Sequence, residues 1–242
     1  MISVCLTTHN GERFLKDQLD SILSQLRNDD ELIISDDGST DNTVDLILAL
    51  KDNRVHLFTF KQPFKSEHTH CFVSRNFENA LKHANGEYIF LADQDDWWMP
   101  NKVEKCVAAL KDNILVVHQA ELCDSNLNFK GQLMYKERFV FKNYLSLKRG
   151  KYYGCTIAFR KELLGLILPF PRNLVLHDQW IGCMAELKGR VFYERTPLIK
   201  YRLHGDNTSG GPSSNTIFFK IWYRLYMFVH LIIRSKLDYT QT

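Results

Sequence analysis

The sequence predicts an α/β fold: a mixed, mostly parallel sheet flanked by helices, with an amphipathic helical appendage at the C-terminus. Over the first hundred residues, short apolar runs typical of buried strands alternate with segments of helical period. Such alternation predicts a parallel-centred sheet with helices on both faces. From about residue 114 the alternation becomes irregular, and residues 216–236 form one long amphipathic pattern.

The first half contains four predicted strands, which are the apolar runs at residues 2–7, 31–35, 55–60 and 87–92. Asn10 is expected to cap the first helix, and the turn DDGSTDNT precedes the second. The third helix is expected to begin at Ser74 and to end at Gly86. Pro100 is expected to open a fourth helix, because proline suits a first helical position.

The second half is expected to contain a helix at 177–188 and four strands, at 115–118, 156–159, 190–194 and 198–203. Residues 207–215 (NTSGGPSSN) have the composition of a linker. We therefore expect one α/β domain over 1–210, with halves 1–112 and 113–210, followed by a helical segment, 211–242.

Composition excludes several classes of protein. The formal net charge of +3 in 242 residues gives no reason to expect a nucleic-acid partner. None of the six cysteines forms a CxxC pair, so buried reduced thiols in a cytosolic protein are expected. The N-terminus does not resemble a signal peptide, and no apolar run reaches the ~20 residues of a membrane span.

Polar residues follow three of the predicted strands, at the edge where an open parallel sheet binds ligands. They are Thr7-Thr8-His9-Asn10, Asp36-Asp37-Gly38-Ser39 and Asp93-Gln94-Asp95-Asp96. Turns and helix caps are the plain explanation of such residues. The last group, however, places three mutually repelling carboxylates beside apolar sequence, which favours a bound Mg²⁺ or Mn²⁺. A metal held by only one or two carboxylates is typical of sites where substrate phosphates complete the coordination shell. A ligand that contains a diphosphate is therefore indicated.

Neither GxxxxGK[ST] nor GxGxxG is present, which argues against an NTPase and a dehydrogenase. The chain instead resembles the family-two glycosyltransferases, which have the Rossmann-like GT-A fold. The resemblance rests on ELIISDDGSTDNT, SRNFENALKHANGEYIFLADQDDWWMPNKV, LHDQWIGCMAEL and KYRLHGDNTSG, and with the N-terminal segment it spans residues 2 to about 210. The later pieces look most like the rhamnosyltransferase-like branch that builds bacterial surface polysaccharides.

The resemblance implies a role for each matching position. It implies that the nucleotide and donor contact Thr8, His9, Asn10, Asp36, Asp37, Arg75, Asp93 and Gln94. It assigns the metal to Asp95 of the DxD-type motif and to His204. It makes Asp178 the catalytic base and places Asp96 and Trp180 on the acceptor side.

Physical reasoning agrees with these roles but leaves alternatives open. Asp178 opens a predicted helix, whose dipole would keep its carboxylate ionised at neutral pH, although a plain helix cap also explains it. Trp180 fits the core equally well, and His204 fits an ordinary loop histidine. Arg202 and Lys200 fit either diphosphate contacts or solvated strand charges.

Residues 216–236 place Lys220, Arg224, His230 and Arg234 on one stripe of a helix, with a wide apolar face opposite. This pattern predicts peripheral contact with the inner face of the cell membrane, where a lipid-linked acceptor would lie. Docking onto the chain's own domain or onto a second copy in a homodimer is the alternative.

The sequence therefore predicts a metal-dependent, inverting glycosyltransferase in the cytoplasm. The donor would be a UDP-, dTDP- or GDP-linked hexose or deoxyhexose, and the acceptor a glycan hydroxyl. A sugar-1-phosphate nucleotidyltransferase is one alternative, but its glycine-rich basic loop is poorly matched by TTHNGER. The other is a non-catalytic nucleotide-sugar-binding protein, which would not require Asp95, Asp178 and His204 together.

Overall fold

The computed structural model describes residues 1–61, 69–135, 152–205 and 216–238, so the predicted linker 207–215 lies outside the described residues. Its strands are β1 (Ile2–Thr8), β2 (Glu31–Asp36), β3 (Val55–Thr59), β4 (Tyr88–Ala92), β5 (Trp97–Trp98), β6 (Leu115–Cys123), β7 (Phe129–Leu133), β8 (Ile157–Arg160) and β9 (Val191–Arg202). Its helices are α1 (Leu15–Leu23), α2 (Thr43–Ala49), α3 (Thr69–Lys82), α4 (Lys102–Leu110), α5 (Leu164–Ile167), α6 (His177–Lys188) and α7 (Ile217–Asp238).

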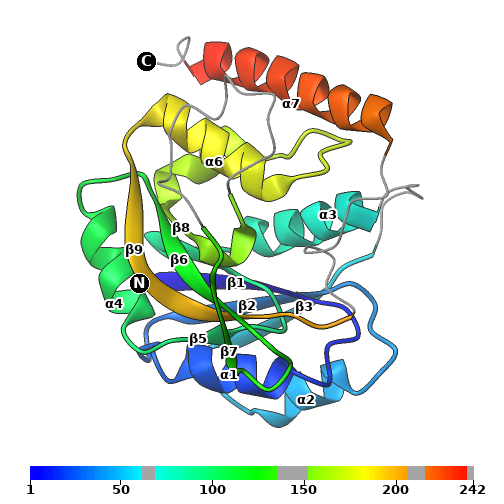
Figure 1. The fold of residues 1–242 in the computed structure, drawn as a ribbon, viewed down its shortest axis with the longest axis vertical. Helices are drawn as coiled ribbons and strands as arrows, with labels where there is room; N and C mark the ends of the chain where they lie inside the picture. The colour runs from blue at the N-terminus through cyan, green and yellow to red at the C-terminus, as the bar shows by residue number, and fades with distance from the viewer. Residues whose placement is uncertain (62–68, 136–151, 206–215, 239–242) are drawn as a thin grey trace.

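The described strands form one sheet in the order β3-β2-β1-β4-β8-β6-β9-β5, with β7 paired to β6 (Figure 1). Strands β1, β2, β3, β4, β6 and β9 run in one direction, and β5, β7 and β8 oppose them. The prediction of a mixed, mostly parallel sheet is confirmed. The chain leaves β1 for β2 on one side and later returns as β4 on the other, so a topological switch point lies between β1 and β4.

Two apolar cores lie on the two faces of the sheet, because side chains along a strand alternate between faces. In β1, Val4 and Leu6 pack toward α1, α2 and α4, whereas Cys5 packs toward α3, α5 and α6. All six cysteines are buried and free, as the sequence predicts.

Several predicted boundaries are wrong for tertiary reasons. Helix α3 begins at Thr69, so Ser74 lies inside it and donates its hydroxyl to the Val175 carbonyl at 3.1 Å. Helix α4 begins after Asn101, which has a left-handed backbone, and not at Pro100. Strand β9 is one long strand where two were predicted, because register shifts against β6 absorb the irregular centre.

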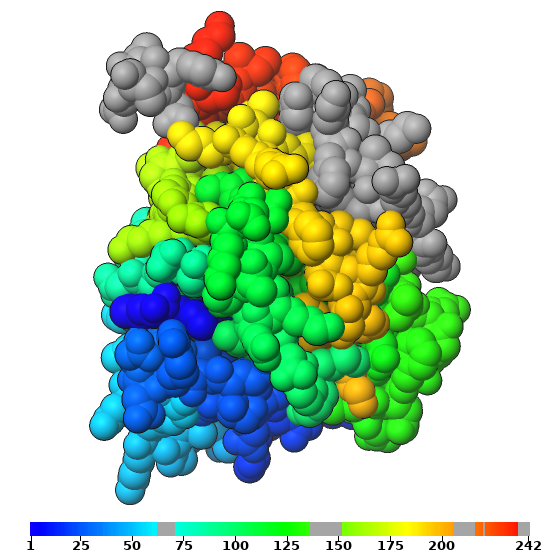
Figure 2. Space-filling view, turned by 90° about the vertical axis from the view of Figure 1, so that its left-hand side faces the viewer, coloured from blue at the N-terminus to red at the C-terminus, as the bar shows by residue number. Residues whose placement is uncertain are grey.

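Helix α7 packs on α5 and α6 at one end of the molecule and buries Leu231 in the core beside α6 (Figures 1 and 2). Its Arg234, one residue of the predicted basic stripe, turns toward the domain and forms part of the packed side. The outward face is apolar and comprises Ile217, Phe218, Ile221, Trp222, Leu225, Val229, Ile232 and Ile233. None of the described helices is long and apolar enough to cross a bilayer.

Candidate functional site

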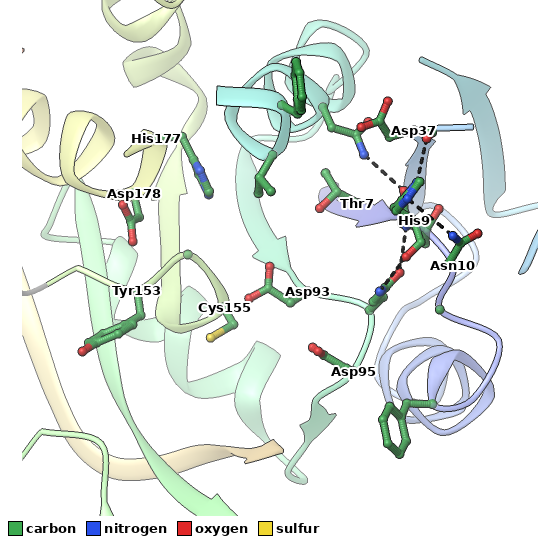
Figure 3. A pocket seen from close by; sticks show the side chains of 18 of the residues that line it. Thr7, His9, Asn10, Asp37, Asp93, Asp95, Tyr153, Cys155, His177 and Asp178 are labelled. Atoms are coloured by element: carbon green, nitrogen blue, oxygen red, sulfur yellow. Dashed lines mark hydrogen bonds between the residues drawn. The ribbon is translucent and has the colours of Figure 1, made fainter. Parts of the chain in front are cut away.

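A pocket of about 700 Å³ opens at the carboxyl ends of β1, β2 and β4. His9, Asn10 and Asp37 lie on one side of it, Asp93 and Asp95 in the middle, and His177 and Asp178 on the far side (Figure 3). The parallel pairing of β1 with both neighbours brings these three regions together, as the strand-end argument predicts.

The loop after β1 is held in place by the loops after β2 and β4. The His9 ring nitrogen Nδ1 lies 2.8 Å from the Asp37 carbonyl oxygen. The His9 backbone N–H donates to Gln94 Oε1 at 2.9 Å, and Gln94 Nε2 donates back to the His9 carbonyl at 3.1 Å. This pair of hydrogen bonds fixes the loop after β1 against the end of β4, and His9 lines the pocket.

Gly11 explains why the loop lies so close to β4. A Cβ atom at this position would come within 2.3 Å of Gln94 Oε1. Any larger residue would therefore displace the amide that holds His9. Asn10, with a positive φ of 49°, accepts from the Thr40 N–H at 2.8 Å through its side chain and so continues the loop toward β2.

In the middle of the pocket, the two predicted metal ligands meet. His204 Nε2 lies 2.8 Å from Asp95 Oδ2, although 109 residues separate them. The Phe14 ring packs against the His204 ring at an interplanar angle of 42°, with centroids 4.8 Å apart. The carboxylate and the imidazole thus lie together beside the end of β9.

The surrounding charge fits a cation. Burial, with the nearby charges of Asp95 and Asp178, raises the pKa of Asp93 to about 7. Burial also raises the pKa of Asp96 well above its ordinary value. Carboxyl groups in such a place become easier to ionise when a positive charge is present, and oxygen and imidazole ligands suit Mn²⁺ or Mg²⁺.

A second set of metal-type ligands, Asp93, Asp96 and Cys155, lies directly behind, with ligand atoms within 4.8 Å of one another. Burial raises the pKa of the Cys155 thiol well above its ordinary value, so the thiol keeps its proton. The buried ammonium of Lys102 donates to the Cys155 carbonyl at 3.0 Å and supplies positive charge at this depth. We therefore assign this inner set to holding the loop of residues 93–96, called the DxD loop below, in place against the protein interior.

Arg202 is neither a diphosphate contact nor a solvated strand charge, the two roles that the sequence allowed. Its guanidinium is buried and donates to the Asp95 carbonyl at 2.9 Å and the Ser125 carbonyl at 2.6 Å. It also pairs with Asp17 of α1 at 3.1 Å, and its backbone N–H donates to Asp96 Oδ1 at 3.2 Å. The residue therefore ties the DxD loop to β9, two positions before His204.

On the far side of the pocket, Asp178 lies in the first turn of α6 and is partly exposed to the cavity. Its carboxylate accepts from the Gln179 N–H at 2.7 Å. Burial nevertheless raises its pKa to about 7, so the expectation of a fully ionised carboxylate at neutral pH is wrong. Its neighbour His177 stacks on Phe77, with ring centroids 4.2 Å apart, and also lines the pocket.

Four predicted site residues do not reach the pocket wall. Arg75 turns away and pairs with Glu78, while Asp36 is buried and accepts from the Thr8 hydroxyl at 2.8 Å. Asp96, the last residue of the DxD loop, is fully buried. Trp180 is also fully buried, and its indole N–H donates to the Ile167 carbonyl at 3.0 Å, so the core explanation is the correct one.

The sequence argument missed much of the wall. Arg13, exposed in the loop after β1, is the one lining residue among those described with a permanent positive charge. Its place in TTHNGER was the available signal. No role was predicted for the rest, which are Thr7, Gly11, Phe14, Phe72, Val73, Asn76, Tyr153, Gly154, Cys155, Val175, Leu176, His177 and Tyr201.

Comparison with known proteins agrees with this geometry. The family model of Glycosyl transferase family 2 matches residues 3–167, which include β1 to β4 and the DxD loop. The chain belongs to glycosyl transferase family 2. The family resemblance inferred from the sequence is thereby confirmed.

Two curated relatives and one solved structure are similar to this glycosyltransferase. The dTDP-rhamnosyl transferase RfbG of Shigella flexneri is 27% identical, over 90% of this chain and 77% of the relative. The UDP-Glc:alpha-D-GlcNAc-diphosphoundecaprenol beta-1,3-glucosyltransferase WfgD of Escherichia coli is 28% identical, over 78% and 70%. The structure of Staphylococcus aureus TarS with UDP-GlcNAc has a TM-score of 0.68 at 19% identity. It covers 96% of this chain, which spans 66% of the TarS chain, and shows the same GT-A fold.

Proposed function

We propose that this family 2 member is an inverting transferase that moves a sugar from a nucleoside diphosphate to a hydroxyl of a glycan. The observation that carries the proposal is a single pocket with His9 and Asp37 at one end, the Asp93–Asp95 pair in the middle and Asp178 at the other. A nucleotide base, a diphosphate and a reacting sugar carbon would occupy those three regions in turn. Residues 1–112 would then hold the donor, and 113–210 the acceptor.

The donor base would pack on His9 and bond to the loop at Asp37, with Thr8, Asn10 and Gln94 shaping that end. The diphosphate would lie near Asp93, and Arg13 would offset its charge. RfbG and WfgD carry dTDP-rhamnose and UDP-glucose chemistry in their names, which supports a UDP- or dTDP-linked hexose or deoxyhexose as donor. A GDP-linked donor remains the third candidate.

Asp95 and His204 would hold the divalent cation, Mn²⁺ or Mg²⁺. Their 2.8 Å approach and the raised pKa of Asp93 support this assignment. A cation in this position would supply stabilisation of the charge that grows on the leaving diphosphate.

Asp178 would act as the base. Its carboxylate would take the proton from the acceptor hydroxyl as that oxygen attacks the anomeric carbon and the nucleoside diphosphate leaves from the opposite face. A single displacement of this kind inverts the anomeric configuration. The pKa of about 7 supports this role, since a general base works best when its pKa is near the operating pH.

A lipid-linked acceptor at the inner face of the cell membrane fits the outer surface of α7. That helix carries four Lys or Arg and one Asp in residues 217–238, around an exposed apolar face. An apolar face with a basic surround is complementary to an anionic lipid surface. WfgD, whose named acceptor is a diphosphoundecaprenol, supports a place in surface polysaccharide synthesis.

A thermal-shift screen of UDP, dTDP, GDP and CDP, each with and without Mn²⁺, tests the donor site. A ligand that binds only the folded state raises the melting temperature with its concentration over Kd. We expect one nucleotide to raise it only when Mn²⁺ is present, and the Asp95→Asn variant to lose that shift. If no nucleotide shifts the wild type in either condition, the proposed donor site is wrong.

A further inference from the structure

The segment Leu168–Asn173 joins α5 to α6 and has no helix or strand of its own. Its backbone groups are bonded instead by side chains of two distant helices, α3 and α7. The same stretch of chain continues through Val175, Leu176 and His177 to Asp178, all of which line the pocket. The position of this segment therefore bears directly on the proposed base.

Helix α3 holds the segment from one side. Arg75 donates to the carbonyl oxygens of Phe170 at 3.5 Å and Pro171 at 3.3 Å, and also to the carbonyl oxygen of Arg172. Glu78, paired with Arg75, accepts from the Phe170 N–H at 3.3 Å. These bonds explain why Arg75 lies away from the donor site.

Helix α7 holds the segment from the other side. Arg234 donates from Nη1 to the Leu168 carbonyl at 2.7 Å and from Nη2 to the Pro169 carbonyl at 2.8 Å. The Tyr226 hydroxyl accepts from the Asn173 N–H at 3.4 Å. Charge-assisted bonds of this length are the stronger kind, and here both go to main-chain oxygens of one loop.

We infer that Arg234 is a positioning residue for sugar transfer. It fixes the Leu168–Asn173 segment from α7 and so sets where Val175, Leu176 and Asp178 stand in the pocket. Helix α7 would then contribute to the geometry of the catalytic site in addition to packing on the domain. The inference rests on the proposed role of Asp178.

The matched pair Arg234→Met and Lys236→Met tests it in the full chain. Both variants lose one positive charge from the last turns of α7, but the exposed side chain of Lys236 bonds to nothing among the described residues. Limited trypsin digestion reports the loop directly, because Arg172 is an exposed cleavage site within it. The substrate for the turnover assay is chosen from the thermal-shift screen. It is the nucleotide sugar that contains the nucleotide found to raise the melting temperature only with Mn²⁺.

For Arg234→Met we expect cleavage after Arg172 to accelerate about tenfold and kcat to fall about tenfold, since small misplacements of catalytic groups cost rates of this order. The donor KM and the nucleotide thermal shift should stay at wild-type values, because the donor end of the pocket is untouched. Lys236→Met should match the wild type in all four measurements. Arg234→Lys keeps one donor nitrogen in place of the two that Arg234 uses. Its cleavage rate and kcat should therefore lie between those of Arg234→Met and the wild type.

Equal kcat in Arg234→Met and Lys236→Met would overturn the inference, whatever the cleavage rate. Should Arg234→Met not fold, Tyr226→Phe removes only the acceptor for Asn173, and it must then show the same pairing of faster cleavage with lower kcat. Asp178→Asn is assayed alongside. Full activity in that variant would count against the proposed base, while the trypsin result would still report on the loop.

Discussion

Asp178 shows how two opposing effects meet in one carboxyl group. The first turn of α6 offers N–H groups and a helix dipole, both of which lower a carboxyl pKa. Burial beside the pocket acts the other way and is the larger effect, so the pKa stands at about 7. The group is thus poised to accept a proton near neutral pH.

The first prediction concerns the pH dependence of turnover. Because only the carboxylate can act as base, wild-type kcat should rise with pH and level off above an apparent pKa near 7. Asp178→Asn should lose about 10²- to 10⁴-fold in kcat. Steady-state kinetics across this pH range measure both effects. A wild-type profile without that rise would show that a different group supplies the base.

The same group makes a prediction about stability that needs no substrate. Since its folded-state pKa is raised from 3.8 to about 7, the native state keeps a proton that the unfolded chain has released, and stability is lost as pH rises through this window. Asp178→Asn should therefore melt higher than the wild type at pH values above about 7 and at the same temperature below about 4. Exposed Asp29→Asn serves as the control and should show no such trend.

At the scale of elements, the end of β9 organises the candidate metal site. Arg202 reaches from this strand to the Asp95 carbonyl and to Asp17 of α1. Its guanidinium also lies over the Phe14 ring, which in turn contacts His204. Strand β9 thus leads directly into one proposed ligand, His204, and braces the loop that carries the other, Asp95. The loop between β4 and β5 is therefore held in place by its bonds to Arg202.

Arg202→Met should accordingly weaken Mn²⁺ binding about tenfold or more, as loss of groups that orient ligands commonly does. The measurement is a Mn²⁺ titration of the nucleotide-dependent thermal shift. Lys200→Met is the matched control on the same strand, because Lys200 bonds to the Leu127 carbonyl and not to the DxD loop. Identical midpoints in the two variants would mean that the brace has no effect on the metal.

At the scale of the whole molecule, α7 has two different faces. Its inner side binds the Leu168–Asn173 segment and buries Leu231, while its outer side leaves eight large apolar residues in contact with solvent. An exposed patch of this kind on one helix marks an interaction surface. Proximity of that surface to the acceptor half of the chain is what a lipid-linked acceptor would require.

We predict that the protein sediments with vesicles that contain anionic phosphatidylglycerol, and less so as salt increases. Replacing Trp222 and Leu225 by serine should lower this partitioning about tenfold or more, because the loss of buried apolar area weakens interfacial binding. Leu48→Ser on α2 removes an even more exposed apolar side chain elsewhere and should have no effect. If the double variant instead dissociates a dimer and leaves vesicle binding unchanged, the surface belongs to a second copy.

The sequence by itself determined the fold class and the sheet edge at which the pocket opens. Polar residues that follow buried strands must meet at one sheet edge, so Thr8, His9, Asp37, Asp93 and Asp95 could be placed from strand order alone. Helix periodicity likewise separated the faces of α7. These are properties of local pattern and backbone geometry.

Only the tertiary structure decided where side chains point and what surrounds them. Arg75 lies on a predicted helix near the donor site, yet the carbonyl groups of a loop 95 residues away draw it to the other side. Asp178 has the right position, yet its pKa depends on burial by residues distant in sequence. Which face of α7 turns inward was settled by carbonyl groups at Leu168 and Pro169, because a periodic pattern defines two faces without naming the partner of either.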